Sequence, residues 1–546
     1  MSVMAVELGA SRLLAPYFSS SQIVWTIIIG TIMIAMALGN IYGGRKADKD
    51  PNPDRLYRRI IIAALWIAAI PVFGKYLIIG ISAVVIFSVN TNFLAIAAFA
   101  SCMVIFVFPL FLLGTCTPCL VKYTVDSLND SGRIVGMLNA SNTIGSIIGT
   151  FIPTFITIPS VGTSITFLIF AGILLALSLI YFMSGRGSRA GFRDGASEKG
   201  AGDEPAKAGI AMRSAAVLIC FALFCGFGCS DSFAFWEGGL AYEGESVYNY
   251  LQVKDNPDRT VLSTNVLFGV QSVYMKDSAY LTGMYYDYAM AAPFMLPVAS
   301  SGVHEKPRVL ILGMGTGTYA TQLRRWLGED SFEIEGVEID DKITKLSYEF
   351  FEQSPEIPIA TYDGRAYLAA VDESYDIIMV DAYQDITIPF QMSSAEFFTL
   401  VREHLSEEGI MVVNMNMRGQ GEGTINQYLS DTIASVFGEV YTVDVPGNTN
   451  RELFAYGAKE EGKAGIIPSR LKAAAVREKN GELKKLLGRV EKGLEPYTAG
   501  SLILTDDKAP VELLGMRVID TMIADEVAYY KDVYKEGGVQ AVLDAL

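Results

Sequence analysis

The sequence predicts an α-helical transmembrane bundle followed by a small β domain and a doubly wound α/β domain of the Rossmann type. Three observations predict this fold. Hydrophobic residues make up 51% of the 546 residues and charged residues only 19%, with a mean hydropathy of +0.33, which is typical of a chain with membrane segments. Charge is uneven, because residues 1–230 hold 16 Lys+Arg and 10 Asp+Glu whereas residues 231–546 hold 27 and 49. From residue 309 onward, short apolar runs alternate with stretches of helical spacing.

Seven stretches of the first half are candidates for membrane-crossing helices, for which roughly 20 apolar residues are needed. These stretches are 1–18, 22–42, 60–80, 93–115, 134–157, 163–184 and 213–230. Small residues recur within 134–157, where they would let neighbouring helices approach closely. We therefore expect a multi-pass protein of the cell membrane, in contact with the lipid bilayer.

The orientation of this half follows from three basic connections, at 45–59, 122–133 and 186–193, which the positive-inside rule places in the cytoplasm. The side on which the second half lies stays open. If 213–230 crosses the membrane, everything after it lies outside the cytoplasm. If 213–230 is interfacial or re-entrant, or if 60–90 crosses twice, the second half faces the cytoplasm.

The expected domain boundaries follow from changes in composition along the chain. Residues 185–212 are rich in Gly, Ala and Ser with mixed charge, which indicates a flexible linker. The other expected parts are a transmembrane domain (1–184), a last membrane segment (213–230), a small β domain (231–290), a Rossmann-like domain (291–460) and a C-terminal helical extension (461–546).

Strand and helix patterns justify the two domains of the second half. Short alternating runs at 248–253, 260–264 and 267–275 indicate the small β domain. After it, strands are expected at 309–312, 333–339, 357–361, 376–381 and 410–414, and helices at 318–328, up to 352, at 365–370 and at 394–405. Strands that alternate with helices in this way form a parallel sheet with helices on both faces.

Residues that can bind a nucleoside close four successive strands of this expected sheet, at the edge where open α/β sheets bind ligands. After the first strand, Gly313, Gly315 and Gly317 let the backbone approach a ligand. Glu338 ends the second strand and can accept hydrogen bonds from both ribose hydroxyls, and Asp363 with Gly364 ends the third strand and can contact an adenine edge. Asp381 ends the fourth strand. Taken alone, Glu338 or Asp363 could also be a helix cap or turn residue.

The chain resembles the polyamine aminopropyltransferases, the spermidine synthase family, whose catalytic domain has a methyltransferase-like fold. The resemblance rests on the runs VLILGMGTGTYATQL, VEIDDKI, YDGRAYL, YDIIMVDAY and EFFTLVREHLSEEGIMVVNM. The first half, with GASRLLAPYF, LGNIYGGRKAD and NASNTIGSIIGTFIPTF, resembles the multi-pass domain that is fused to such enzymes in bacteria, and TDDKAPVELL is similar to the same subgroup.

The resemblance implies transfer of an aminopropyl group from decarboxylated S-adenosylmethionine to an amine such as putrescine. It implies that Asp381 is the general base, that the glycines, Glu338 and Asp363 hold the donor, and that no metal and no permanently bound cofactor takes part. The residues expected to bind the acceptor amine are Asn249, Gln271, Tyr285, Asp287, Tyr383 and Asp385.

Four departures from the family pattern leave the acceptor open. Thr316 stands where the glycine loop of the family carries an acid, and Asn249 stands for a glutamine. The Tyr-His-Glu signature becomes Tyr285-Tyr286-Asp287, and Asp385 lies four residues after Asp381 instead of three. Each lost carboxylate weakens the binding of an ammonium group, because a charge-assisted hydrogen bond contributes roughly 1.5–3 kcal/mol.

Two other functions stay as alternatives. Thr316 is compatible with a methyltransferase that uses intact S-adenosylmethionine. An amine transporter or sensor would use ionisable residues inside the membrane, and Glu7 and Arg12 are expected to be the only ones deep in a span. The alternative for both, which we favour slightly, is a surface position on an interfacial helix. The scarcity of histidine (His304 and His404) argues against a histidine zinc site or a Ser-His-Asp triad, and the acidic second half argues against nucleic acid. The sequence does not determine the oligomeric state and is compatible with a homo-oligomer.

Overall fold

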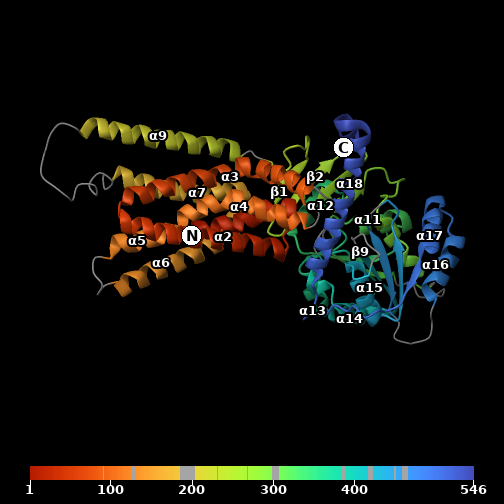
Figure 1. The fold of residues 1–546 in the computed structure, drawn as a ribbon. Coiled ribbons are helices and arrows are strands. Elements are labelled where there is room, and N and C mark those ends of the chain that lie inside the picture. The colour runs from red at the N-terminus through yellow and green to blue at the C-terminus, as the bar shows by residue number, and fades with distance from the viewer. Residues whose placement is uncertain are drawn as a thin grey trace. The chain divides into compact units, whose positions relative to one another are not determined.

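The computed structural model describes residues 1–89, 92–125, 131–184, 203–229, 232–266, 269–297, 306–382, 388–415, 422–447, 450–457 and 465–545. Within them the chain divides into two compact units. Unit 1 comprises Met1–Gly238 and Gly244–Val247, and unit 2 comprises Gly239–Glu243 and Tyr248–Leu546. Figure 1 follows the chain through both units.

Unit 1 is helical. Its elements are α1 (Ser2–Phe18), α2 (Gln22–Lys49), α3 (Pro53–Ser88), α4 (Phe93–Gly114), α5 (Cys116–Thr124), α6 (Ser131–Ile152), the π-helical turn η2 (Pro153–Thr157), α7 (Ile158–Met183) and α9 (Asp203–Gly228). Helices α2 and α4 approach closely at small residues, since a Cβ atom added to Gly114 would lie 2.8 Å from the carbonyl oxygen of Met36. A larger residue at Gly114 would separate the two helices.

Among the described residues of unit 1, four helical stretches are long and apolar enough to cross a membrane. They are Gln22–Lys49, Pro53–Ser88, Phe93–Thr124 and Ser131–Met183, and a shorter apolar helix covers Ser214–Gly228. Large apolar side chains such as Met33, Leu38 and Phe87 are exposed on them, as expected for a surface that faces lipid. The predicted spans 134–157 and 163–184 fall in one run, which is broken at Gly162, where φ is 80° and ψ is 175°.

The structure corrects three expectations about unit 1. Helix α3 is one continuous helix, so the alternative in which 60–90 crosses twice is wrong. Helix α9 begins at Asp203, inside the expected linker 185–212, whose first part lies outside the described residues. Glu7 and Arg12 are not the only ionisable residues within the candidate spans, because Lys75 of α3 is 2% exposed and donates a hydrogen bond to the carbonyl oxygen of Ser232 at 2.7 Å. Arg12 itself donates to the carbonyl oxygen of Val247.

Two sheets build the second half of the chain. The smaller one has the order β1-β2-β3-β4, with β1 (Tyr242–Glu245), β2 (Tyr250–Asp255), β3 (Arg259–Ser263) and β4 (Ser272–Met275). The larger one has the order β12-β10-β11-β9-β8-β5-β6-β7. Its strands are β5 (Arg308–Leu312), β6 (Glu333–Glu338), β7 (Ile359–Thr361), β8 (Tyr375–Val380), β9 (Leu405–Met415), β10 (Glu439–Asp444), β11 (Arg451–Tyr456) and β12 (Glu495–Tyr497).

The larger sheet is parallel from β9 through β8, β5 and β6 to β7, whereas β11, β10 and β12 are joined to it antiparallel. The doubly wound prediction is confirmed. The antiparallel strands were not predicted. The expected helical extension 461–546 also holds β12, which pairs with β10 and therefore belongs to the sheet.

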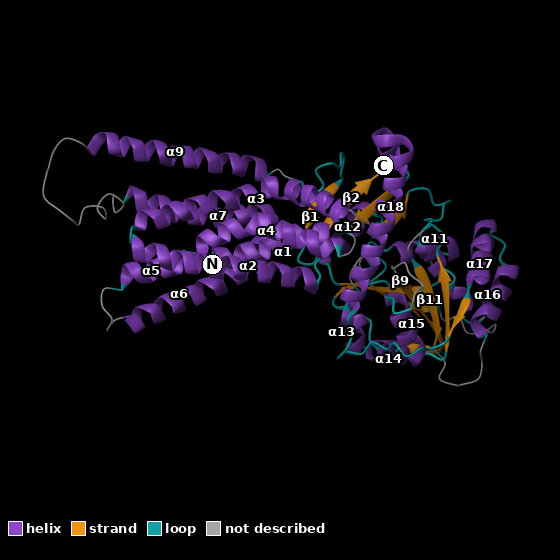
Figure 2. Cartoon of the chain, in the orientation of Figure 1, coloured by secondary structure: helices purple, strands orange, loops and turns teal. Residues whose placement is uncertain are grey.

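Helices cover both faces of the larger sheet (Figure 2). They are α10 (Tyr285–Ala289), α11 (Thr318–Leu327), α12 (Asp341–Phe350), α13 (Gly364–Ala370), α14 (Ala395–Glu403), α15 (Ile425–Val436), α16 (Ile466–Arg477), α17 (Gly481–Gly493) and α18 (Val511–Ala545). Because strand side chains alternate, Ile311, Met379 and Phe454 enter the core under α10, α11, α16 and α17, whereas Leu312 and Val380 pack with α13, α14 and α15.

Polar side chains begin the helices that follow the strands. Asp340 accepts a hydrogen bond from the backbone N–H of Lys342 at 3.1 Å, Asp363 from that of Ala366 at 2.9 Å, and Ser394 from that of Phe397 at 3.2 Å. Each cap satisfies an N–H that has no partner inside its helix and contributes about 1 kcal/mol. These caps fix where the strand-to-helix turns lie, and the candidate site is built at those turns.

Candidate active site

The glycine-rich turn between β5 and α11 forms the floor of the candidate site. Gly313, Gly315 and Gly317 have φ values of 87°, 54° and 84°, in the left-handed region that glycine adopts without strain. At Gly313 the neighbourhood also excludes a side chain, because an added Cβ atom would lie 2.5 Å from the carbonyl oxygen of Asp381 and 2.7 Å from Cα of Ala382. The turn is therefore packed directly against the end of β8.

Glu338 closes β6 and is 7% exposed. Its carboxylate accepts hydrogen bonds from the backbone N–H of Gly315 at 2.8 Å and from that of Asp340 at 2.9 Å. Burial raises the pKa of Glu338 to about 7, although these two backbone donors act in the opposite direction. The side chain thus ties the glycine turn to β6, and each carboxylate oxygen keeps a lone pair for a further donor.

Asp381 follows β8, and both of its carboxylate oxygens are held. The hydroxyl of Tyr285 donates to Oδ2 at 2.8 Å, and Nδ2 of Asn414 donates to Oδ1 at 2.8 Å. Burial raises the pKa of Asp381 to about 7, and the hydrogen bonds from Asn414 and Tyr285 limit that rise. A carboxylate that titrates near neutral pH and is fixed in direction is suited to accept a proton.

Asn414 and Asn450 are functional candidates that sequence reasoning missed. Nδ2 of Asn450 donates to Oδ1 of Asn414 at 2.8 Å, which leaves the amide nitrogen of Asn414 facing Asp381. Asn414 is 2% exposed and lies near the carboxyl end of β9, next to the strand that leads to Asp381. A polar residue near the end of a buried strand was the signal that could have identified it.

Two tyrosines and Gln271 stand beside Asp381. The rings of Tyr285 and Tyr286 have their centroids 4.0 Å apart, and both residues are buried. The hydroxyl of Tyr286 donates to the backbone carbonyl oxygen of Gln271 at 2.7 Å. Tyr285 and Gln271 are therefore brought to the site, the first through its side chain and the second through its backbone.

The other predicted site residues lie elsewhere or are occupied locally. Asn249 donates to Oδ2 of Asp340 at 3.0 Å, which places it at the end of β6. The carboxylate of Asp287 accepts from the backbone and hydroxyl of Thr282 and from the N–H of Gly283, at 2.7–3.0 Å, so it holds its own turn. Tyr383 and Asp385 lie outside the described residues.

The second expected donor-binding carboxylate, Asp363, has a structural task as well. Asp363 is half-buried and caps α13, as described above, so the helix-cap alternative for this residue is realised in the structure. Gly364 is packed closely, since an added Cβ atom would lie 3.3 Å from Cε of Met392. Among the described residues, no group of three His, Cys, Asp or Glu side chains is arranged to hold a metal ion.

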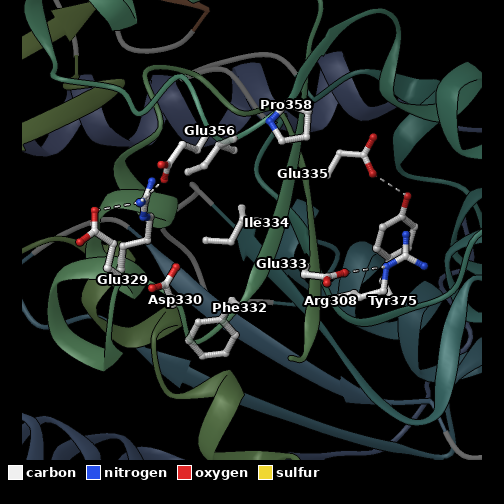
Figure 3. A pocket seen from close by; sticks show the side chains of 12 residues that line it. Arg308, Glu329, Asp330, Phe332, Glu333, Ile334, Glu335, Glu356, Pro358 and Tyr375 are labelled. Atoms are coloured by element: carbon white, nitrogen blue, oxygen red, sulfur yellow. Dashed lines mark hydrogen bonds and ion pairs between the residues drawn. The ribbon is translucent and has the colours of Figure 1, made fainter. Parts of the chain in front are cut away.

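A separate cavity of about 360 Å³ opens at the opposite edge of the sheet, at the start of β5 and β6 (Figure 3). Its charged side chains pair with one another: Arg324 contacts Glu329 at 2.9 Å and Glu356 at 2.8 Å. Glu335 accepts a hydrogen bond from the hydroxyl of Tyr375 at 3.1 Å. These charged groups already pair with one another, so we take the site around Asp381, and not this cavity, as the candidate active site.

The family model and the curated relatives name one family. A family model described as "Spermine/spermidine synthase domain" matches residues 295–454. A relative from Bifidobacterium longum, "Probable polyamine aminopropyl transferase", is 53% identical over 352 residues, which cover 62% of this chain and 76% of that protein. The "Polyamine aminopropyltransferase" of Vibrio vulnificus is 27% identical over 42% of this chain and 75% of its own length.

Two solved structures are also similar. One is a probable spermidine synthase from Corynebacterium glutamicum, with 19% identity and a TM-score of 0.37 over 48% of this chain and 97% of that one. The other is a spermidine synthase in complex with the transition state analogue AdoDATO, with 20% identity and a TM-score of 0.33 over 46% of this chain and 87% of that one.

Proposed function

This chain belongs to the polyamine aminopropyltransferase family and is a transferase, and on that premise we propose that it is a membrane-bound enzyme that moves an aminopropyl group from decarboxylated S-adenosylmethionine to a polyamine-type amine. The observation that carries the proposal is the carboxylate of Asp381, fixed by Tyr285 and Asn414 beside the glycine turn.

In the proposed reaction the neutral nitrogen of the acceptor attacks the propyl carbon that is bonded to the sulfonium. The new C–N bond forms as the C–S bond breaks, and the electron pair of that bond stays on sulfur, which leaves as methylthioadenosine. The proton lost by the nitrogen goes to Asp381. Its pKa of about 7 allows a proton transfer near neutral pH, and its two hydrogen bonds hold the accepting oxygens in place.

The donor is proposed to lie over β5 and β6. Glu338, which keeps free lone pairs beside the glycine turn, would accept the two ribose hydroxyls. Asp363, at the end of β7, would contact the adenine while it caps α13. The three left-handed glycines let the chain turn tightly after β5, and the donor is proposed to lie against the backbone of this turn.

Attachment to the cell membrane as a multi-pass protein is proposed from unit 1. Its four long apolar stretches can each cover the apolar thickness of a bilayer, and they expose large apolar side chains that water would not favour. The partners of the protein would accordingly be a small amine of the putrescine type and the lipid bilayer.

Methyl transfer from intact S-adenosylmethionine is the second candidate, and Thr316 is the observation that favours it. Thr316 is 1% exposed, and its hydroxyl has no hydrogen-bond partner among the described residues. An uncharged side chain at this position neither attracts the donor's ammonium group nor repels a donor carboxylate.

The products distinguish the two candidates. The full chain, purified in detergent, is given each form of S-adenosylmethionine together with a panel of diamines and polyamines, and mass spectrometry identifies the products. Methylthioadenosine together with an amine heavier by one aminopropyl unit is the expected result. S-adenosylhomocysteine with a methylated amine would overturn the proposal in favour of methyl transfer.

A further inference from the structure

Glu452 of β11 has its carboxyl group in the interior of unit 2. The residue is 0% exposed, and neither of its carboxylate oxygens has a hydrogen-bond partner among the described residues. Buried polar groups are nearly always hydrogen-bonded, because an unsatisfied one keeps its full cost of desolvation. A ligand that reaches Glu452 would supply the missing hydrogen bonds.

Strand pairing places Glu452 in one row with the proposed base. Glu452 and Asn414 are direct partners of the antiparallel pair β11 and β9, so their side chains project from the same face of the sheet. Asn414 in turn donates to Asp381 at 2.8 Å. The row Asp381, Asn414 and Glu452 thus crosses three neighbouring strands.

The alternation of side chains identifies the face. Phe454, two residues after Glu452, belongs to the same apolar cluster as Tyr285 and Tyr319. Glu452 therefore points to the face that carries the hydroxyl of Tyr285 and the carboxylate of Asp381. Burial raises the pKa of Glu452 well above its usual range and the charge of Asp381 raises it further, with no opposing effect from a described lysine or arginine.

The order of the strands indicates whether the donor or the acceptor lies near Glu452. On one side of β8 lie β5 and β6, which carry the glycine turn and Glu338; on the other side lie β9 and β11, which carry Asn414 and Glu452. If the donor lies over β5 and β6, Glu452 stands beyond Asp381 at the acceptor's end. Strands β8 and β11 are two strand spacings apart, roughly 10 Å, a span that an alkyl chain of several methylene groups can bridge.

We propose that Glu452 binds the second ammonium group of the acceptor amine and thereby selects diamines and polyamines over monoamines. The proposal rests on the proposed function for the placement of donor and acceptor. An ammonium group supplies hydrogen-bond donors and a positive charge, which together satisfy both oxygens of Glu452. The reacting nitrogen at Asp381 must be neutral, whereas the nitrogen at Glu452 stays charged, so the two carboxylates have different tasks.

The experiment compares 1,4-diaminobutane with 1-aminobutane, which has the same carbon chain and lacks the second ammonium group. Full-length wild-type protein and the Glu452→Gln variant are assayed in detergent with decarboxylated S-adenosylmethionine. We expect Glu452→Gln to raise the KM of the diamine about tenfold or more, to change kcat little, and to leave the KM of the monoamine unchanged. Glu495→Gln, at an exposed glutamate of β12 in the same sheet, is the matched control and should change neither value.

A carboxylate that only supports the fold gives a different result. Equal changes for both amines, or no change for either, would overturn the assignment of Glu452. Glu452→Asp, which keeps the charge, should restore part of the preference for the diamine. If Glu452→Gln instead weakens the affinity for decarboxylated S-adenosylmethionine and leaves the selection between the amines intact, Glu452 belongs to the donor site and the proposal is wrong.

A binding measurement separates this proposal from the proposed function. Calorimetry measures the binding of 1,4-diaminobutane to wild type and Glu452→Gln in the presence of methylthioadenosine, without any turnover. A wild type that forms no methylthioadenosine with any amine would refute the function, whereas loss of diamine binding in Glu452→Gln would still support the ammonium site. Unchanged diamine binding in the variant would refute the site even if the enzyme turns over.

Discussion

The hydroxyl of Tyr285 donates a hydrogen bond to Oδ2 of Asp381 at 2.8 Å, and this contact joins a helix of the amino-terminal part of unit 2 to the carboxyl edge of the large sheet. The bond stabilises the ionised carboxylate against the cost of its burial. It therefore extends to lower pH the range in which Asp381 can accept a proton.

The first prediction concerns pH. A base must be ionised to act, and the pKa of Asp381 is raised by burial to about 7. The value of kcat/KM for the donor, measured at saturating amine, should rise about tenfold per pH unit below 7 and level off above it. Tyr285→Phe removes a donor to the charged form, so the rise should shift to higher pH and the activity at pH 7 should fall several-fold.

The pH–rate profiles of the two proteins check this prediction together. Recovery of Tyr285→Phe toward the wild-type rate at high pH would show that the hydroxyl acts through the ionisation of Asp381. A flat wild-type profile between pH 5.5 and 7, or an equal loss in Tyr285→Phe at every pH, would contradict it.

The second prediction concerns the two asparagines. Asn414→Ala removes the hydrogen-bond donor to Oδ1 of Asp381 and should lower kcat about tenfold or more. The proposed base then loses one of the two hydrogen bonds that hold its carboxylate in place. Asn450→Ala leaves that donor in place and only frees the amide of Asn414 to rotate, so its loss should be smaller. Steady-state kinetics rank the two variants, and a larger loss in Asn450→Ala would be incompatible with this chain of hydrogen bonds.

The third prediction concerns Gly313. A methyl group there would meet the carbonyl oxygen of Asp381 at 2.5 Å, at a backbone angle that an L side chain adopts only with strain. Gly313→Ala should lower the melting temperature and the activity together. Gly438→Ala is the matched control, since a Cβ atom there meets nothing within 4 Å. Equal melting temperatures for the two variants would count against the close packing of turn and strand.

The fourth prediction concerns the membrane. If unit 1 crosses the bilayer, the protein should stay with the membrane pellet after extraction with alkaline carbonate and should enter solution only in detergent, because its exposed apolar side chains need lipid or detergent. Release by carbonate or by high salt would show a peripheral protein. The extraction is read by immunoblot of the two fractions.

The sequence predicted the parallel part of the fold because strands and helices alternate there with different periods. Val309 to Leu312 is buried throughout and reads as a central strand, and the glycines and Asp340 mark the turns around it. It did not predict β12, a three-residue strand whose short pattern carries no period. It also missed Lys75, which lies in the apolar stretch of α3 after the charged first turns of that helix.

At the candidate site the sequence identified residues that end strands, such as Asp381 and Glu338, and missed residues that depend on strand pairing. Glu452 follows a polar stretch, and the sequence analysis predicted no strand around it. Only the pairing of β11 with β9 shows that it is buried opposite Asn414. Asp287 was predicted to bind the amine because it lies next to Tyr285 in the sequence. The sequence did not show that its carboxylate accepts hydrogen bonds from the neighbouring turn instead.

The role of Asp381 as the base is tested most directly by the rate of methylthioadenosine formation in wild type and Asp381→Asn at saturating donor and amine. We expect a rate about 10²–10⁴-fold lower in Asp381→Asn, as is typical when a general base is removed. Binding of the donor should be unchanged, because Asn keeps the shape of Asp381 and stands outside the donor's proposed contacts. An undiminished rate would contradict this role, since the proton of the amine would then have to leave by another route.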